Sequence, residues 1–417
     1  MPINEIVIVG AGPAGLTLAL LLAKQGIHVV VLEANDSLDD QPRATHYSPP
    51  ALHELQRAGV LEDVRKHPNA FIPNGLTWRR LDGSPLATLN MPSIPAEYQQ
   101  VCLPLNQLTP IILQHLMEQP TAEVRWKHRV MGGRLGQDHN SAWVTVQSAS
   151  GEEKIKADYV VGCDGGNSVI RKSLFEKRSD FAGHTWDAQI IASTVYYEDY
   201  YKHAPDWTDS NFLCDVENWA MVAKIQADGL LKITYGEVPG LTDDEYLERL
   251  SSKYQTILPG HPTPEKFNLV QVSPYKVHQR CAPRLRIGRF LLAADAAHLC
   301  NPFGGLGLTG GLVDVGNLFD CLNGIHKGLA DEAILDRYDE VRRQKWRDII
   351  NPVSSGNITT IWTDPAQLQD SSLIRNFKEA EGNSAKLVEL LKGGTAIMHD
   401  FTKEYHSAGG IGVEGIT

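Results

Sequence analysis

A glycine-rich turn near the N-terminus is the first segment whose residue types and spacing could do chemistry. Gly10, Gly12 and Gly15 follow the pattern G-x-G-x-x-G between an apolar strand at residues 6–9 and an apolar helix that begins near residue 16. The first glycine of such a turn permits a tight bend, the second lets a pyrophosphate reach the main chain, and the third lets the helix pack on the strand. The turn therefore predicts a dinucleotide phosphate site at the helix N-terminus.

An acidic residue completes this first site. Glu33 stands at the end of the next apolar strand, residues 29–32. A carboxylate at this position can accept hydrogen bonds from a ribose diol, and it disfavours a 2′-phosphate. The pattern fits either FAD or NAD. The alternative interpretation is a packing turn followed by a solvated glutamate.

A second segment combines Asp164, Gly165, Ser168 and Arg171 in the pattern D-G-x-x-S-x-x-R. It follows an apolar strand at residues 159–162 and opens a helix, so we expect its backbone amides beside the cofactor. The alternative interpretation is a capped strand-to-helix turn with Arg171 on the surface.

A third segment, residues 288–311, runs from an apolar strand through Asp295 into a glycine-rich loop and a helix. Asp295 could accept hydrogen bonds from the polyol of a cofactor, while Gly305 and Gly307 keep side chains away from a flat ring. The positive end of the following helix would stabilise negative charge on that ring. His298 precedes the loop, so we interpret it as a structural residue rather than as an acid or base.

The elements that carry these segments predict an α/β fold (α+β overall). Residues 5–33 read as strand, turn, helix and strand, which is one βαβ unit with buried parallel strands. Asp82-Gly83 predicts a hairpin turn within residues 71–91. Residues 185–280 are rich in β-branched and aromatic residues and predict a mostly antiparallel sheet. We therefore expect a Rossmann-like cofactor domain with an inserted, mostly antiparallel β-sheet domain.

The expected domains are discontinuous in sequence. The cofactor-binding domain takes residues 1–70, 101–180 and 284–350, and the substrate-binding sheet domain takes residues 71–100 and 181–283. Residues 351–417 are expected to form a C-terminal helical segment.

Composition narrows the class of protein. The 417 residues carry a net charge of −11, which argues against nucleic acid or an anionic membrane as a partner. No apolar stretch is long enough to span a bilayer and no signal peptide is visible, so we expect a cytoplasmic protein. The six cysteines form no C-x-x-C pair and no zinc spacing, so we expect reduced thiols and no metal.

The three segments, in this order and spacing, resemble the single-component flavin monooxygenases of the para-hydroxybenzoate hydroxylase type. The resemblance spans roughly residues 3–345 and includes Pro42-Arg43-Ala44, Gln107 and the stretch at residues 335–343. It implies the para-hydroxybenzoate hydroxylase-like fold and a non-covalent FAD. It also implies that NAD(P)H is consumed as a co-substrate without a second nucleotide fingerprint.

The resemblance also assigns cofactor contacts. Glu33 would hold the adenosine ribose, Arg43 and Gln107 the phosphate–ribityl region, Asp164 the pyrophosphate and Asp295 the ribityl chain. The loop from residue 302 to 309 would line the isoalloxazine. The complete predicted set is Gly10, Gly12, Pro13, Ala14, Gly15, Glu33, Arg43, Ala44, Gln107, Val130, Asp164, Gly165, Asp295, Pro302, Gly305, Gly307, Leu308 and Thr309.

Two residues depart from the family pattern. Ala294 stands where the family usually has glycine before the aspartate, and Thr309 stands where it usually has asparagine. We expect the alanine to be tolerated through a negative φ, so FAD binding is still predicted.

The activity implied by the resemblance is a monooxygenation. Reduced flavin captures O2 as a 4a-hydroperoxide, which hydroxylates or epoxidises an aromatic, indolic or other electron-rich small molecule in secondary metabolism or aromatic catabolism. Candidate substrate contacts are His46, Tyr47 and Tyr235. Aromatic residues of the inserted sheet that could line the substrate site are Trp186, Tyr196, Tyr197, Trp207, Phe212, Trp219 and Tyr235.

Other activities stay open at this level. One is a related flavoenzyme with Baeyer–Villiger or other oxidative chemistry, although the halogenase signature W-x-W-x-I-P is absent. Another is a non-enzymatic FAD-dependent binding or sensor protein. A monomer and a homodimer are both compatible with the sequence.

Overall fold

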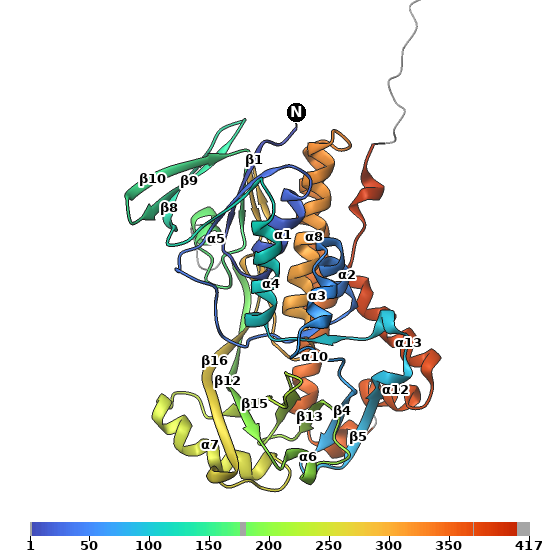
Figure 1. Ribbon diagram of the computed structural model, residues 1–417. Coiled ribbons are helices and arrows are strands. Elements are labelled where there is room, and N and C mark those ends of the chain that lie inside the picture. Colours follow the sequence, from blue (N-terminus) through green and yellow to red (C-terminus); the bar gives the residue numbers. More distant parts are fainter. Residues whose placement is uncertain (1, 176–180, 370, 407–417) are drawn as a thin grey trace, which may run out of the picture.

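A six-stranded sheet forms the upper layer of the protein (Figure 1). The computed structural model describes residues 2–175, 181–369 and 371–406. All neighbouring strands of this sheet are parallel except β17 and β18. Its order is β17 (Arg286–Ile287), β18 (Phe290–Leu292), β11 (Tyr159–Gly162), β1 (Glu5–Val9), β2 (His28–Leu32) and β7 (Ala122–Arg125).

Three helices lie side by side over this sheet: α1 (Pro13–Ala23), α4 (Leu105–Met117) and α8 (Leu306–His326) (Figure 1). Residues 14–23 of α1 are all buried, which explains why this helix is apolar on every side. A small antiparallel sheet of β8 (Arg129–Gln137), β9 (Ala142–Ser148) and β10 (Gly151–Ala157) projects from the same layer.

An eight-stranded sheet forms the lower layer, and the long strands β12 and β16 connect it to the upper one (Figure 1). Its pairs are antiparallel except β13 with β4. Its order is β19 (His298–Leu299), β16 (Phe267–Cys281), β12 (Ala182–Tyr197), β15 (Leu231–Glu237), β14 (Ala220–Lys224), β13 (Ser210–Cys214), β4 (Gly75–Arg80) and β5 (Pro85–Asn90).

The two faces of the eight-stranded sheet meet different surroundings. Helix α7 (Asp243–Ile257), which begins with a capping box between Thr242 and Glu245, covers the outer face. Ile191, Ile233 and Tyr235 are buried in the cluster that contains the apolar side of α7. Because side chains alternate along a strand, the residues between them face the six-stranded sheet.

Short elements connect these layers. The two-stranded sheet of β3 (His46–Tyr47) and β6 (Val101–Cys102) lies where the chain passes from one layer to the other. The remaining short elements are α2 (Pro49–Ala58), α3 (Leu61–Lys66), α5 (Val169–Leu174), α6 (Tyr200–His203), η1 (Met91–Ser93), η2 (Ala96–Tyr98), η4 (Pro264–Lys266) and η5 (Ala294–Ala296).

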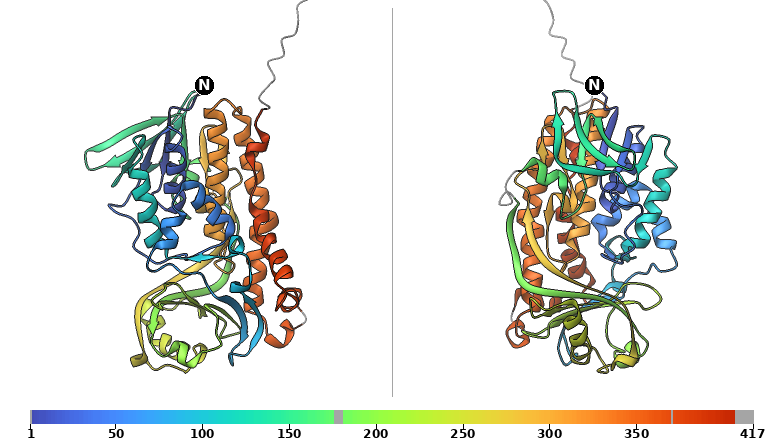
Figure 2. Two further views of the ribbon diagram at one scale, coloured as in Figure 1. Left: turned by 45° about the vertical axis from the view of Figure 1, so that its right-hand side comes forward. Right: turned by 90° about the vertical axis from the view of Figure 1, so that its left-hand side faces the viewer.

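The C-terminal helices run along one side of both layers (Figure 2). A π-helical turn, η6, joins α9 to α10, and Pro352 explains it because proline cannot donate to the carbonyl four residues earlier. The bounds are α9 (Ala333–Lys345), η6 (Trp346–Ile350), α10 (Asn351–Ile361), α11 (Pro365–Leu368), α12 (Ser372–Ala380), α13 (Ser384–Gly393), η7 (Gly394–Ile397) and η8 (Phe401–Glu404). Residues 407–417 of the predicted C-terminal segment lie outside the described residues.

The predicted βαβ unit, the hairpin and the antiparallel sheet are all present. Gly83 in the predicted turn has a φ of +85°, as such a turn requires.

Helices α2 and α8 meet through a buried charge cluster. Arg57 donates to Glu54, at 2.9 Å, and to Asp320. A Cβ on Gly316 would lie 2.1 Å from a Glu54 carboxylate oxygen, so a larger residue here would displace the Glu54 carboxylate. Burial, reinforced by the nearby Asp320, raises the pKa of Glu54 to about 7 despite the opposing Arg57.

We therefore expect stability to fall as the pH rises from about 4.5 to about 7. The folded state holds the Glu54 proton more tightly than the unfolded chain, whose carboxyl has a pKa of 4.5, so this contribution is complete below pH 4.5 and is lost as the pH passes 7. Glu54→Gln should abolish this contribution, whose loss lowers the free energy of unfolding by up to about 3 kcal/mol between low and high pH. Thermal unfolding at pH 5 and pH 8 measures it. The exposed Glu62→Gln is the control, and an equal slope in the wild type and Glu54→Gln would contradict the prediction.

Candidate active site

The three predicted segments meet at the carboxyl ends of β1, β11 and β18. Gly10 donates from its backbone to the Leu32 carbonyl at 2.8 Å, and Ala293 donates to the Gly162 carbonyl at 3.1 Å. A Cβ on Gly10 would lie 2.5 Å from the Cys163 carbonyl oxygen. The parallel sheet therefore brings all three segments to one edge, where such folds bind their ligands.

The three glycines of the first turn have different reasons for being glycine. Gly10 has a φ of +107°, and a Cβ on Gly15 would lie 2.0 Å from the Gly10 carbonyl oxygen, so the fold itself requires both. Gly12 has a φ of −75°, and a Cβ there would meet no protein atom within 4 Å. Neither strain nor crowding explains Gly12, whereas close approach of a ligand does. Pro13 is the first residue of α1, where a missing N–H costs no hydrogen bond.

Glu33 faces this turn. Its carboxylate accepts hydrogen bonds from the backbone N–H groups of Ala11 and Asn35, both at 2.9 Å. The Glu33 carbonyl accepts a hydrogen bond from the backbone N–H of His128 at 2.8 Å. Strand β8 begins directly after His128 and carries the buried Val130. The Glu33 carboxylate is therefore tied to the turn rather than free in solvent, and its contact with a ribose stays a prediction.

Asp164 serves its own helix. It accepts from the Ser168 hydroxyl at 2.6 Å and from the backbone N–H groups of Val169 and Ile170 at 2.6 and 3.1 Å. Burial raises the pKa of Asp164, and these hydrogen bonds oppose that shift. The predicted turn with a surface Arg171 is half right, because the turn is capped but Arg171 is only 4% exposed.

Arg171 joins the second segment to the third. Its guanidinium donates to the Gly166 carbonyl at 2.6 Å and to the Ala296 carbonyl at 2.8 Å. The D-G-x-x-S-x-x-R pattern thus fixes the position of the turn that carries Asp295.

The segment at residues 40–45 runs along the start of α4. Leu105 donates from its backbone to the Ala44 carbonyl at 3.1 Å. The Arg43 side chain is exposed and pairs with Asp39 at 2.9 Å. Gln107 lies in the first turn of α4, and its side-chain oxygen is buried without a hydrogen-bond partner among the described residues.

The expectation of a negative φ at Ala294 is wrong. Ala294 has a φ of +56°, in the left-handed region that alanine disfavours. Asp314 accepts from its backbone N–H at 3.0 Å. A Cβ on Gly311 would lie 2.8 Å from the Ala294 Cβ, so a glycine on α8 makes room for the extra methyl. The turn is therefore held from α8, and Asp295 beside it stays exposed.

His298 belongs to the same buried cluster, in agreement with its predicted structural role. Its Nε2 lies 2.7 Å from one Asp314 oxygen, and Arg342 donates from Nε to the other at 2.6 Å. Arg342 also donates to the Ile397 carbonyl at 2.6 Å. Burial alone would raise the pKa of Asp314, but His298 and Arg342 lower it to about 2. No pattern in the sequence pointed to this role of Arg342.

The glycine-rich loop leads into α8 without a side-chain cap. Gly305 is the N-cap with a φ of +65°, and a Cβ there would meet no protein atom within 4 Å. Pro302 is exposed, and Gly307 and Leu308 are partly exposed. Thr309 is buried, and its hydroxyl lies 2.9 Å from that of Ser48.

Of the three candidate substrate contacts, only His46 lies between the two layers, with Nε2 3.3 Å from the Ser210 hydroxyl on β13. Tyr47 is fully buried and donates to the Leu103 carbonyl at 2.5 Å, so it is a core residue. Tyr235 packs against Tyr254 of α7 on the outer face. The prediction that Tyr47 and Tyr235 contact the substrate is therefore wrong.

The residues at this edge fit FAD. Both α1 and α8 begin at a glycine without a side-chain cap, so their first N–H groups are available to phosphate and to an anionic ring. Gly12 and Gly305 leave room for close approach, and Gln107 has an unused acceptor. The individual cofactor contacts remain predictions.

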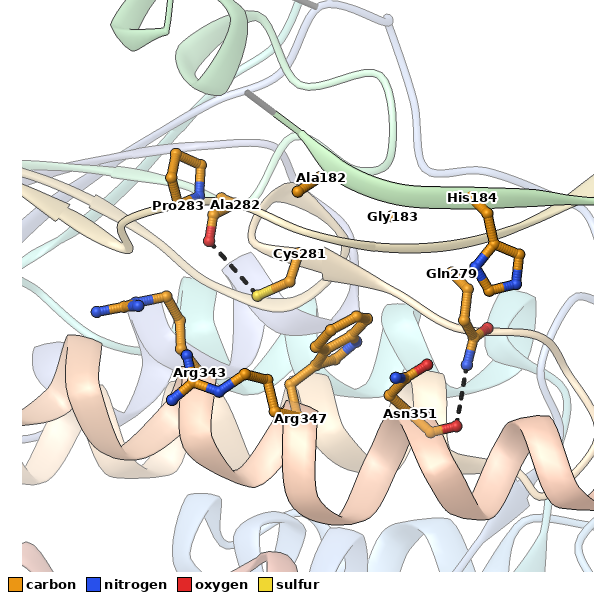
Figure 3. Close-up of a pocket in the computed structure, with 11 residues that line it drawn as sticks. Ala182, Gly183, His184, Gln279, Cys281, Ala282, Pro283, Arg343, Arg347 and Asn351 are labelled. Carbon is orange, nitrogen blue, oxygen red and sulfur yellow. Dashed lines mark hydrogen bonds between the residues drawn. The ribbon is translucent and has the colours of Figure 1, made fainter. Parts of the chain in front are cut away.

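A separate cavity of about 390 Å³ lies between β12, β16 and the α9–α10 helix (Figure 3). Most of its polar side chains have protein partners: Gln279 donates to Ser354 at 2.7 Å, Arg343 to Asp339 at 2.6 Å, and Trp346 to the Leu299 carbonyl at 3.3 Å. None of the predicted cofactor residues lines it.

Three further properties of the described chain bear on the predicted class. None of its helices is long and apolar enough to cross a membrane. All six cysteines are free thiols. Within residues 2–175, 181–369 and 371–406, no group of three or more His, Cys, Asp or Glu residues could hold a metal ion.

Comparison with known proteins identifies the family. The FAD binding domain profile matches residues 4–352. Para-nitrophenol 4-monooxygenase of Pseudomonas sp. (strain WBC-3) is 36% identical over 396 residues, 93% of this chain and 94% of that protein. The chain belongs to the FAD-dependent aromatic monooxygenase family. A second member, 6-hydroxy-3-succinoylpyridine 3-monooxygenase of Pseudomonas putida (strain DSM 28022 / S16), is 33% identical and covers 86% of this chain and 89% of that protein.

Solved structures agree with this monooxygenase assignment. The p-nitrophenol 4-monooxygenase of Pseudomonas putida DLL-E4 superposes with a TM-score of 0.87 at 33% identity, and the match covers 95% of this chain and 99% of that one. A flavin-dependent monooxygenase in complex with FAD and substrate has a TM-score of 0.76 at 19% identity, covering 96% and 72% of the two chains. The para-hydroxybenzoate hydroxylase-like fold is thereby confirmed.

For a monooxygenase of this family, we expect Glu33→Ala to weaken FAD binding. The change would remove the predicted charged acceptor for the ribose, worth about 1.5–3 kcal/mol for each hydrogen bond. It also frees the Ala11 and Asn35 N–H groups. FAD titration of the apoprotein should show at least a tenfold higher Kd. Glu62→Ala on exposed α3 is the control, and an unchanged Kd for Glu33→Ala would remove Glu33 from the cofactor site.

Proposed function

We propose that this monooxygenase inserts one oxygen atom from O2 into a phenol or a hydroxypyridine, with NAD(P)H as the reductant. The names of the two relatives, a para-nitrophenol and a hydroxypyridine monooxygenase, support this substrate class. The observation that carries the proposal is the contact of the glycine-rich loop with an aromatic cluster. Phe303 of that loop is fully buried and packs edge-on against Trp219, with ring centroids 5.7 Å apart.

The aromatic cluster extends away from the loop. Trp362, just after α10, lies 5.5 Å from Trp219 and 5.4 Å from Trp186, measured between ring centroids. The indole N–H groups of Trp186 and Trp362 are buried without hydrogen-bond partners among the described residues. These rings offer an apolar wall that holds a flat substrate and excludes water.

FAD would be held at its adenosine end by Gly12 and Glu33 and at its ring end by the loop from residue 302 to 309. In this family FAD supplies the reduction of O2 and the transfer of one oxygen atom to an electron-rich ring. The start of α8 stabilises negative charge beside that loop, because its first N–H groups have no side-chain acceptor.

His46 links the two layers as a neutral side chain. Burial lowers the pKa of His46 to about 4, with Asp209 opposing and Lys232 adding to the shift. Its two ring nitrogens lie 2.8 Å from the Thr45 hydroxyl and 3.3 Å from the Ser210 hydroxyl. A neutral imidazole between two hydroxyls can accept a proton on one nitrogen and release one from the other. We assign His46 this proton-transfer role.

The overall reaction is that of a monooxygenase. NAD(P)H, one proton, O2 and the aromatic substrate yield NAD(P)+, water and the hydroxylated product. One oxygen atom of O2 enters the product and the other enters water. We further propose a cytoplasmic enzyme that acts as a monomer or homodimer, since its thiols are free and its net charge is −11.

An aerobic NAD(P)H-oxidation assay tests this function. The purified enzyme, loaded with FAD, is given 4-nitrophenol, phenol or 2-hydroxypyridine, and both the product and hydrogen peroxide are quantified. We expect at least one of these to accelerate NAD(P)H oxidation and to yield an oxygenated product. Tight FAD binding without turnover of any of them would favour a binding or sensor protein. Ring expansion of a cyclic ketone, offered in a parallel assay, would favour Baeyer–Villiger chemistry.

A further inference from the structure

Two buried threonine hydroxyls on neighbouring strands have no hydrogen-bond partner. Thr194 on β12 is 3% exposed and Thr234 on β15 is 1% exposed, and the hydroxyl oxygen of each is unpaired among the described residues. By contrast, Thr77 on β4 of the same sheet lies 2.9 Å from the Thr208 hydroxyl. An unpaired buried hydroxyl is costly, so this pair requires an explanation.

The strand register places both threonines on the face towards the six-stranded sheet. Ile233 and Tyr235 point outward to α7, so Thr234 between them points inward. On β12, the Ser193 hydroxyl lies 2.6 Å from that of Tyr254 on α7, so Thr194 also points inward. His46 and Phe303 approach this same inner face.

A cation lies beside the two threonines. Lys232 is paired directly with Thr194 across the sheet, where side chains on one face come within about 5 Å. Its ammonium donates to the Arg43 carbonyl at 2.9 Å and to the Pro42 carbonyl at 3.4 Å. An ammonium carries three N–H groups, so one is left for another acceptor. Burial, with a smaller effect of Arg43, lowers the pKa of Lys232 to about 8, so it stays mainly charged at pH 7.

The hydroxyl of Tyr275 lies near Thr234, and the interaction with the Thr234 side chain opposes the rise that burial causes in the pKa of Tyr275. The Thr234 oxygen nevertheless has no partner at hydrogen-bond length. Tyr275 is paired with Ile190 across the sheet, on the inner face. The donors available on this face are therefore two threonines, a tyrosine and a lysine, which together suit an oxygen that carries negative charge.

We propose that Thr234, assisted by Thr194 and Lys232, binds an oxygen substituent of the aromatic substrate that carries full or partial negative charge. This inference rests on the proposed function and adds the positioning residues of its substrate. The oxygen can be an ionised ring hydroxyl or an oxygen of an electron-withdrawing substituent such as a nitro group. The segment at residues 41–43 covers Lys232, and Lys232 is the cross-strand partner of Thr194. This segment therefore lies over the Lys232–Thr194 side of the site, and Thr234 takes the central position.

Thr234→Val tests the proposal, because valine keeps the shape and removes the hydroxyl. The holoenzyme is titrated with 4-nitrophenol, phenol and nitrobenzene while the flavin absorbance and the protein fluorescence are recorded, and the Tm is measured separately. We expect Kd to rise roughly 10- to 100-fold for ligands that place their oxygen here, with an unchanged or higher Tm. Thr234→Ser should restore the affinity.

Ser193→Ala is the matched control, since Ser193 precedes Thr194 on β12 and faces α7. It loses the hydrogen bond to Tyr254, so its Tm should fall while its ligand affinities stay the same. The control thus separates a loss of stability from a loss of recognition.

The three ligands distinguish the two sources of the oxygen. Weaker binding of phenol and 4-nitrophenol but not of nitrobenzene supports an ionised hydroxyl, and weaker binding of nitrobenzene and 4-nitrophenol but not of phenol supports the nitro group. Unchanged Kd values for all three in Thr234→Val overturn the inference and leave the proposed function standing. A wild-type enzyme that neither binds nor oxygenates any of the three, nor 2-hydroxypyridine, would overturn both.

Discussion

Replacing Asp314 with alanine should lower the free energy of unfolding by about 3–5 kcal/mol, because it breaks a buried ion pair and leaves the charge of Arg342 without its acidic partner. Asp314 and Arg342 are both fully buried, with 2.6 Å between Arg342 Nε and the carboxylate. The same carboxylate lies 2.7 Å from His298 and accepts from the Ala294 N–H. Ala294 would lose the contact that holds its left-handed conformation, so FAD affinity should fall as well.

Thermal or denaturant unfolding and FAD titration measure the two effects. Asp336→Ala on the exposed side of α9 is the control. Asp336 also pairs with an arginine, Arg286, at 3.0 Å, but this ion pair lies at the surface. Its cost should stay below about 1 kcal/mol. The pKa of Asp314 lies below that of the unfolded chain, so its contribution is present above pH 4 and is lost as the pH falls towards 2. Equal stabilities of the two variants would show that the cluster does not hold the turn.

Gly305→Val should leave a folded, yellow protein whose hydroxylation is slowed roughly 10- to 100-fold, as expected when a small displacement disturbs a reacting geometry. Gly305 has a φ of +65°, which a β-branched residue strongly disfavours, yet its Cβ would meet no protein atom within 4 Å. The added side chain would therefore crowd the flavin expected beside the loop rather than other protein atoms. The adenosine end is expected to be held separately by Gly12 and Glu33, so FAD should remain bound.

Gly328 supplies the matched control for this variant. It follows the opposite end of α8, with a φ of +68° and no protein atom within 4 Å of its Cβ position. Gly328→Val therefore carries the same backbone strain without the ligand. Stopped-flow absorbance with peroxide quantitation shows whether Gly305→Val slows flavin reduction or wastes NAD(P)H as peroxide. Wild-type rates with full coupling would mean that the loop does not lie against the flavin.

The positions of the three motifs could be read from the sequence because each follows a buried parallel strand. The carboxyl ends of such strands meet at one edge, so Gly10, Asp164 and Asp295 were expected near one another. Their individual contacts were harder to predict. Asp164 caps its own helix through residues that follow it closely in the chain. Arg171 ties two motifs together from a buried position, and this could not be predicted because its partner Ala296 lies far away in the sequence.

The errors have a common physical cause, which is that the sequence does not reveal which element covers a given face. The alternation of side chains along β15 was predictable, but only the placement of α7 shows that the Tyr235 side chain lies on the outer face. For the same reason Thr234, the next residue towards the N-terminus, was not singled out. The positive φ of Ala294 was missed because Gly311, seventeen residues later, makes the room that the methyl group needs.

Hydroxylation under ¹⁸O2 in ordinary water tests the central claim most directly. The FAD-loaded enzyme, NAD(P)H and the phenol or hydroxypyridine that stimulates NAD(P)H oxidation are incubated under the labelled gas, and the product is analysed by mass spectrometry. A monooxygenase with the site described above should place one ¹⁸O atom in the product for each NAD(P)H consumed productively. A product that takes its new oxygen from water, or NAD(P)H oxidation that yields only peroxide with every substrate offered, would contradict the account.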